Sequence, residues 1–144
     1  MRISTKGRYA LRVMIELAKC KANEYMPLHT LSERQNISEK YLEGILGVLV
    51  RAKVLDGARG KGGGYRLNVD PKKCSVWDIL SLTETSVSPV QCLDDAENRC
   101  ERANICVTLP VWKELDSIVK NYLGSVMLEQ FLRGEKTDKV PDGE

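Results

Sequence analysis

The feature that most limits how this chain can fold is a polar stretch, QCLDDAENRCERANIC, between Val90 and Val107. Its few apolar residues follow neither the spacing of a helix nor the alternation of a strand, so it cannot order itself by burying side chains. The stretch contains Cys92, Cys100 and Cys106, with seven residues between the first two cysteines and five between the last two. Three thiolates can hold such a loop by binding a metal centre. We therefore expect a loop that depends on a bound metal centre for its order.

Charge is divided unevenly along the chain. Residues 1–73 contain 15 Lys and Arg against 7 Asp and Glu, a formal charge of +8, whereas residues 74–144 contain 7 against 13, a formal charge of −6. A basic half indicates a polyanionic partner, and a solvated surface with uneven charge is the alternative. We favour the polyanion because the basic half also has the architecture of a DNA-binding module.

The length of 144 residues fits one domain, or one small domain with an appendage. The N-terminal run is charged throughout and no apolar stretch is long enough to cross a membrane, so we expect a cytoplasmic protein with no membrane partner. In a reducing compartment, five cysteines argue against disulfides and for metal binding or thiol sensing. Cys20 and Cys74 lie apart from the loop and are expected to be small buried residues.

Apolar periodicity predicts three helices in the basic half. Ser4 or Thr5 can cap the first, which runs to about Lys21. The second covers residues 28–35, and Ser38 is a good N-cap for the third. The third helix is expected to bury a stripe formed by Leu42, Ile45, Leu46, Leu49 and Val50. Two short helices joined by a tight turn, the second beginning at a capping Ser, are typical of a helix–turn–helix.

The pattern changes in the run DGARGKGGGYRLNV, where two short extended segments flank a group of glycines. This predicts a β-hairpin with a glycine-rich tip, and a hairpin directly after a recognition helix is a wing. Arg59 and Lys61 lie at the tip, where they could reach phosphates or the minor groove. A nucleotide-binding loop is the alternative, but the run has no GK[ST] sequence and does not match the dinucleotide motif.

The acidic half predicts three more helices. Ser75 can cap a fourth helix, Pro110 suits the first turn of a fifth that ends at Gly124, and Ser125 starts a short last helix. The fifth helix has an apolar stripe formed by Val111, Leu115, Ile118, Val119 and Tyr122. Such a helix packs either on its own domain or on a second copy, and we favour dimerisation because helix–turn–helix proteins usually read two half-sites with two-fold symmetry.

These elements predict a mainly α fold with a small β wing, a winged helix–turn–helix followed by a long C-terminal dimerisation helix. We expect the winged helix–turn–helix over residues 1–84 and the cysteine loop over 85–107. The dimerisation and terminal helices follow over 108–133. The charged tail 134–144, which contains Pro and Gly, is expected to be disordered.

The number of cysteines in the loop bears on the kind of metal centre. Iron–sulfur clusters are usually held by four thiolates, and this loop offers three. Zinc held by three cysteines and one further ligand is the main alternative, but zinc sites more often have closely spaced cysteine pairs. Wide spacing suits a larger centre, so we favour a cluster over zinc, and place unliganded or redox-active thiols third.

Four segments form a specific combination: MRISTKGRYALRVMIELA, ISEKYLEGIL, ARGKGGGYRL and the later three-cysteine loop. Together they resemble the Rrf2 family of winged-helix repressors, in particular its iron–sulfur cluster regulators, called IscR. The resemblance covers residues 1 to about 133. It implies a homodimer that binds palindromic double-stranded operators, carries a 2Fe–2S cluster near the dimer surface and controls cluster-assembly genes, mostly as a repressor.

By position, Cys92, Cys100 and Cys106 match the three cluster thiolates of the family. Other matching positions lie on the exposed face of the third helix, at Ser38, Lys40, Tyr41 and Glu43, and in the wing at Arg59. Glu43 matches an acidic residue with which the family tunes the DNA sites that it accepts. A carboxylate can accept a hydrogen bond from a cytosine amine, and it repels a misplaced phosphate.

The loop departs from the family's pattern. IscR-like loops commonly place five residues between the first two cysteines and a His where this chain has Leu109. Relatives with a ligand on the first helix use positions that match Arg8 and Arg12, which cannot bind metal. The fourth ligand is therefore unknown, and the local candidates are Asp94, Asp95, Glu97, Glu101 and Asn104. The one histidine, His29, is expected at the surface near DNA.

Two regulators of the same family are alternatives. One is a nitric-oxide or redox-sensing repressor that also holds a cluster on three cysteines. The other is a repressor of cysteine metabolism that works through a partner enzyme, but such relatives lack the cysteine loop. An enzyme is not supported, because the sequence has one His and no nucleophile with a base at fixed spacing.

Overall fold

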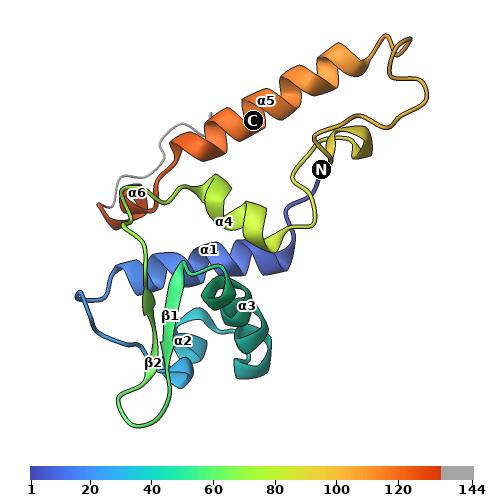
Figure 1. Ribbon diagram of the computed structural model, residues 1–144. Helices are drawn as coiled ribbons and strands as arrows, with labels where there is room; N and C mark the ends of the chain where they lie inside the picture. Colours follow the sequence, from blue (N-terminus) through green and yellow to red (C-terminus); the bar gives the residue numbers. More distant parts are fainter. Residues whose placement is uncertain (134–144) are drawn as a thin grey trace, which may run out of the picture.

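The computed structural model describes residues 1–133 (Figure 1). Its elements are α1 (Thr5–Ala18), α2 (Leu28–Gln35), α3 (Glu39–Arg51), β1 (Leu55–Ala58), β2 (Gly64–Leu67), α4 (Val76–Thr83), the 3₁₀ turn η1 (Gln91–Leu93), α5 (Leu109–Ser125) and α6 (Leu128–Leu132). The predicted fold class, mainly helical with a small two-stranded wing, is confirmed. The tail 134–144 that was expected to be disordered lies outside the described residues.

One hydrophobic core joins α1, α2, α3 and the wing, and is completed by α4 and α6. Its fully buried side chains include Met14 of α1, Leu31 of α2 and Leu46 of α3. Burying each such side chain contributes roughly 1.5–3 kcal/mol. The stripe predicted for α3 is correct at four of its five positions, and Val50, at the wing side, is only half-buried. The apolar spacing of the sequence therefore fixes how α3 faces the core.

The helix starts follow the expected capping residues. Ser4, Ser38 and Ser75 are the N-caps of α1, α3 and α4, and each side chain accepts a hydrogen bond from a backbone N–H three residues ahead. The end of α1 was placed too late, at Lys21. The helix ends at Ala18, because the next two backbone N–H groups bond to carbonyls only three residues back and close the last turn tightly.

The wing is an antiparallel hairpin in which Leu55 faces Leu67 and Ala58 faces Gly64. Gly60 and Gly62 have φ values of 85° and 78°, which glycine adopts without the steric cost that other residues bear. The sequence did not reveal a further pairing, in which Met26 exchanges two backbone hydrogen bonds with Tyr65, at 2.8 and 2.9 Å. That bridge fixes the wing to the segment before α2.

A second apolar cluster lies between α4 and the C-terminal half of α5. Val76 and Leu80 of α4 pack there against Val119 and Leu123 of α5. Two expectations at the end of α5 were wrong. Gly124 does not end the helix, which continues to Ser125, and the last helix begins after Met127 rather than at Ser125. The reason is that the chain between the two helices is extended and pairs with the segment before α4, where the Val76 N–H donates to the Val126 carbonyl at 2.8 Å.

Candidate DNA-binding surface and cysteine segment

A cleft of about 600 Å³ separates the recognition helix α3 from the wing. Glu43 and Arg51 line it from α3, and Arg59 and Tyr65 line it from the wing. The structure thus brings together Glu43 and Arg59, which are 16 residues apart in the sequence. Lys61 is exposed at the wing tip. A carboxylate and two guanidinium groups around one cleft can accept from a base and bind backbone phosphate.

The other residues expected to read DNA lie at the exposed N-terminal end of α3. Ser38, Lys40 and Tyr41 are all exposed there, with 43% of the Tyr41 surface accessible. The Ser38 hydroxyl also caps the helix, since it accepts from the Tyr41 N–H at 3.3 Å. The Tyr41 ring meets the Tyr9 ring of α1 edge to face, with the ring centroids 5.9 Å apart. This contact joins the recognition helix to α1.

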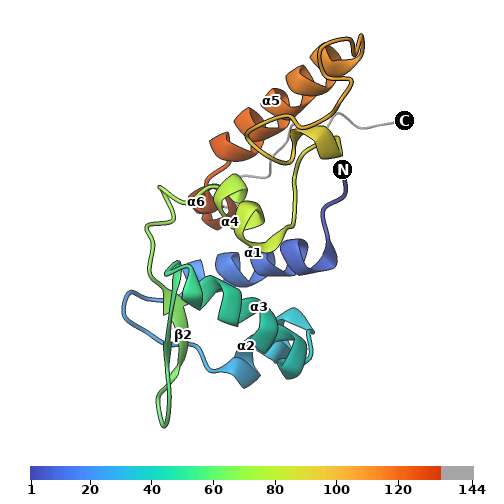
Figure 2. The same ribbon diagram turned by 45° about the vertical axis from the view of Figure 1, so that its right-hand side comes forward.

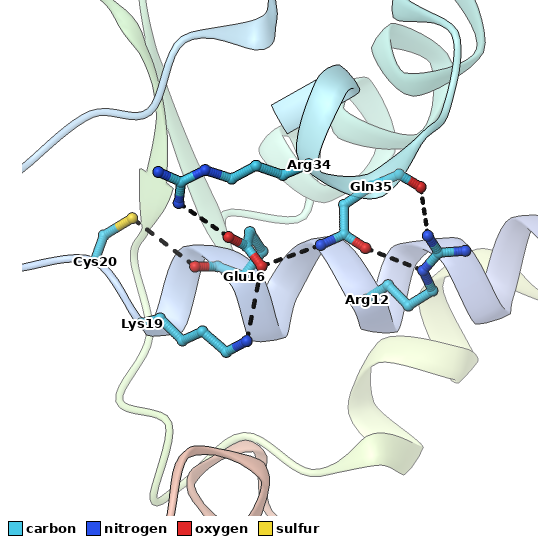
Figure 3. A network of polar contacts seen from close by, with 6 residues as sticks. All are labelled: Arg12, Glu16, Lys19, Cys20, Arg34 and Gln35. Atoms are coloured by element: carbon cyan, nitrogen blue, oxygen red, sulfur yellow. Dashed lines mark hydrogen bonds and ion pairs between the residues drawn. The ribbon is translucent and has the colours of Figure 1, made fainter. Parts of the chain in front are cut away.

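Polar contacts between α1 and α2 hold the helix–turn–helix in place (Figure 3). Glu16 of α1 accepts from Arg34 at 3.0 Å and from the Gln35 side chain at 3.1 Å. Arg12 donates to the Gln35 side chain at 3.0 Å and also to its backbone carbonyl. His29 is exposed, as expected, and lies between the carboxylates of Glu33 and Glu39 at 3.2 and 3.0 Å. These groups position α2 and α3 rather than form a metal site.

The cysteine segment, residues 85–107, lies at the far end of the molecule from the wing (Figures 1 and 2). Apart from η1 it has no helix or strand, and residues 88–108 include no buried side chain. All five cysteines of the chain are free thiols. The segment therefore lacks both a core and a disulfide.

The three thiols of the cysteine segment are only partly gathered. Cys92 and Cys100 line one pocket of about 460 Å³ together with Asp95 and Glu97. Cys106 does not line that pocket and lies just before α5. Within residues 1–133, no three His, Cys, Asp or Glu side chains are close enough together to hold a metal ion. The donor set suits a cluster chemically, but Cys106 must approach the other two before all three can bind one.

The thiols differ in how easily they ionise. A hydrogen bond between Cys106 and the Thr108 hydroxyl, at 3.4 Å, lowers the pKa of Cys106. Burial, and after it the charge of Asp78, raises the pKa of Cys74 to about 11. Burial, followed by the charge of Glu24, also raises the pKa of Cys20, which is only half-buried where burial was expected. Cys106 therefore ionises more readily than Cys20 and Cys74, and the thiolate is the form that binds metal.

The fifth helix carries an apolar face with no partner among residues 1–133. Val111, Ile118 and Tyr122 are 59%, 57% and 60% exposed, and Val107, just before the helix, is 90% exposed. Their spacing puts them on one side of the helix. The stripe predicted from the sequence included the first three of these residues together with Val119, but Val119 packs on α4. The predicted stripe is thus divided between an intramolecular face and an open face.

The family model of Rrf2, described as an iron-dependent transcriptional regulator, matches residues 3–134. The chain belongs to the Rrf2 family. The IscR regulator of Xenorhabdus nematophila is 32% identical over 142 residues, which are 99% of this chain and 85% of that protein. The solved structure of T. potens IscR has a TM-score of 0.74 at 29% identity and covers 99% of this chain and 94% of its own. The solved structure of CymR, the global cysteine regulator of B. subtilis, has a TM-score of 0.75 at 33% identity. The match covers 94% of this chain and 99% of the CymR chain.

The family confirms that the protein is a DNA-binding transcriptional regulator and not an enzyme. Within residues 1–133, no helix combines the length and the apolar character needed to span a membrane. Sequence reasoning missed the separation of Cys106 from the other two cysteines, and it missed the hydrogen bonds that Ser4, the N-cap of α1, donates to Glu84 at the end of α4. Neither has a local signal in the sequence, since the first depends on the path of an irregular loop and the second joins residues 80 apart along the chain.

Proposed function

We propose that this Rrf2 regulator binds a palindromic operator as a homodimer and senses iron–sulfur cluster supply through a 2Fe–2S cluster in the cysteine segment. The observation that carries the proposal is a segment with three free thiols and no buried side chain over residues 88–108. Such a segment needs a bound group to order it, and thiolates are the usual ligands of such clusters. The regulated genes would be those of cluster assembly, mostly repressed, and such a regulator works in the cytoplasm, where the chromosome is.

In this proposal Cys92, Cys100 and Cys106 are the thiolate ligands. Asp95 and Glu97 are the carboxylates best placed for the fourth position, because they line the pocket of Cys92 and Cys100. Asp94 is engaged by the Ser86 hydroxyl and is less available. The cluster supplies a centre whose binding, loss or oxidation reports on iron and sulfide. A carboxylate ligand is weaker than a thiolate here, and this suits a centre that must be lost on demand.

Dimerisation is proposed through the open face of α5. Large exposed apolar patches mark protein interfaces, and a helix–turn–helix protein that reads a palindrome needs two copies. Ile118→Asp should convert the protein to a monomer in sedimentation analysis while its helical content stays the same. Lys113→Asp, an exposed change outside the apolar face, is the matched control and should remain dimeric. A dimeric Ile118→Asp protein would contradict this interface.

The cluster is tested with protein purified without oxygen. We expect the absorption and Mössbauer spectra of a 2Fe–2S centre, with two iron and two sulfide ions per chain. Cys100→Ala should lose the cluster, because two thiolates are too few to retain iron. Cys20→Ala is the matched control and should keep it, since that thiol lies near the end of α1, outside the segment. Stoichiometric zinc without sulfide would reject the cluster, and normal cluster content in Cys100→Ala would reject the proposed set of three thiolate ligands.

A second candidate is a repressor that responds to cysteine metabolism or to oxidants without a cluster. The similarity to CymR, the cysteine regulator, favours it. The lowered pKa of Cys106 also suits a thiol that oxidants modify. The two candidates differ in one measurement, because the second requires operator binding to change when the cluster-free protein is treated with oxidant or with a partner enzyme. The cluster sensor should change its binding only when iron and sulfide are loaded or removed.

A further inference from the structure

Glu84 makes a contact that spans the molecule. It follows α4 directly and is the last residue before the cysteine segment. Its Oε1 atom accepts two hydrogen bonds from Ser4, one from the backbone N–H at 2.9 Å and one from the hydroxyl at 2.7 Å. Ser4 is the N-cap of α1 and in turn accepts from the Gly7 N–H at 3.0 Å. One carboxylate therefore completes the cap of a helix that lies 80 residues earlier in the chain.

The space around this carboxylate is closely fitted. Gly7 is buried, and a Cβ atom there would lie 2.0 Å from the Glu84 carboxylate and 3.1 Å from a methyl group of Leu80. A buried glycine inside a helix weakens the helix, so it needs a local reason. Here the reason is space, because the absent side chain at Gly7 leaves room for the Glu84 carboxylate. Gly7 and Glu84 form one fitted contact, and a methyl group at residue 7 would displace the carboxylate.

The same contact leads towards the cysteine segment. Beyond Glu84, the Ser86 hydroxyl donates to the Asp94 carboxylate, and the Ser88 hydroxyl donates to the Leu93 carbonyl at 3.0 Å. These bonds fold residues 86–94 around η1, which contains Cys92. Figures 1 and 2 both show the chain's N-terminus beside this part of the segment. Residues 84–94 thus form a hydrogen-bonded unit that is fixed to α1 through Glu84.

In the other direction, α1 is joined to the DNA-reading helices. Tyr9 contacts Tyr41 of α3 edge to face, and Arg12 bonds to Gln35 at the end of α2. A continuous series of contacts therefore runs from η1 through Glu84 and α1 to the recognition helix. A series of this kind can carry coupling, but only a measured dependence of one end on the other demonstrates it.

We propose that Glu84 is a positioning residue. It couples the order of residues 85–94 to the position of α1 and, through α1, to the position of the recognition helix. The inference deepens the proposed function, because Cys92 is one of the proposed cluster ligands. It is tested without a cluster, since coupling between two sites is reciprocal. If the segment influences DNA binding, then DNA binding must influence the segment.

The experiment measures hydrogen exchange in cluster-free protein, with and without a duplex that the wild-type protein has enriched from a random library. In the wild type, we expect the duplex to slow exchange in residues 85–94 by about fivefold or more. Glu84→Ala should reduce that response to less than about twofold, because its methyl group cannot accept from Ser4. Glu84→Gln should be intermediate, since its amide oxygen accepts but carries no charge.

Gly7→Ala tests the same contact if Glu84→Ala folds poorly, because alanine favours the helix while its methyl group displaces the carboxylate. It should lose the response to the duplex, and the double variant should be no worse than either single one. Thr85→Ala, an exposed neighbour, is the matched control and should keep the wild-type response.

The proposal is overturned if Glu84→Ala and Gly7→Ala keep the full response, even with lower stability or DNA affinity, because Glu84 would then be only a helix cap. A wild-type segment that does not respond to the duplex overturns it as well. Neither result touches the proposed cluster, which iron and sulfide analysis tests separately.

Discussion

The winged-helix unit, residues 1–84, and the cysteine segment, residues 85–107, are held in different ways. The winged-helix unit buries Met14, Leu31 and Leu46 completely in a core shared by its helices and wing. The cysteine segment leaves Ile105 and Val107 67% and 90% exposed, and its order rests on a few hydrogen bonds around η1. The difference teaches that one part of this chain is stabilised by buried apolar side chains, to which α6 contributes, whereas the other is free to respond to a ligand.

The largest expected effect is on the stability of the winged-helix unit. Leu46→Ala should lower the free energy of unfolding by about 2–5 kcal/mol, because it removes a fully buried side chain from the core. Cys100→Ala, at an exposed position of the cysteine segment, should change it by no more than about 0.5 kcal/mol. Urea unfolding of cluster-free protein measures both. Equal losses of unfolding free energy in the two variants would show that the cysteine segment is part of the core, and the contrast between the two regions would then be wrong.

The next effect is on DNA affinity. Arg59→Ala should weaken operator binding by about 1–3 kcal/mol, because it removes a guanidinium from the cleft between α3 and the wing. The slope of log affinity against log salt should also become shallower, since fewer counterions are released. Fluorescence anisotropy over a range of salt concentrations measures both quantities. Cluster content should stay at the wild-type level, and unchanged affinity would remove Arg59 from the DNA surface.

A smaller effect on strength, but a distinct one on specificity, is expected for Glu43→Ala. The variant should bind its best operator with an affinity within about threefold of wild type and accept a broader set of sites, because no carboxylate penalises the wrong base. Binding to a panel of single-base operator variants measures the preference. If the order of affinities for the operator variants and the differences between those affinities stay unchanged, this role for Glu43 is rejected.

The smallest effect is expected on thiol chemistry within the cysteine segment. The Thr108 hydrogen bond lowers the pKa of Cys106, so more of this thiol is ionised at any pH below its ordinary pKa. Thr108→Val should raise that pKa and shift the pH midpoint of Cys106 alkylation upwards, without changing the stability of the winged-helix unit. Mass spectrometry of cluster-free protein alkylated across a pH series measures the shift. Buried Cys74, with its pKa raised to about 11, is the internal reference and should react slowly throughout.

The features that the sequence predicted correctly depend on residues that are close together along the chain. The caps at Ser4, Ser38 and Ser75 and the buried face of α3 depend on residues within one or two turns, and the sequence revealed all of them. The glycine-rich wing was also predictable, because a hairpin is local. The domain limits and the roles of the DNA-reading and cluster-binding residues stay predictions.

What the sequence did not reveal depends on contacts between distant residues. The start of α6 was misplaced because Val126 pairs with Val76, 50 residues earlier. The stripe of α5 was read as one face because periodicity cannot tell a side chain that packs on α4 from one that is left open. The contact of Glu84 with Ser4 could not be found for the same reason.

The attachment of α5 has a mechanical consequence. The helix has 17 residues and is therefore about 26 Å long. Val119 and Leu123, which pack on α4, lie in its C-terminal half, and its N-terminal end projects from the winged-helix unit together with the cysteine segment (Figures 1 and 2). Such a helix acts as a lever whose pivot is the packing on α4. The far end lies about 18 Å from that pivot, so a tilt of about 10° there moves it by about 3 Å. In the proposed dimer joined along α5, the same tilt would change the separation of the two recognition helices, and in helix–turn–helix dimers that separation matches one turn of DNA or a multiple of it.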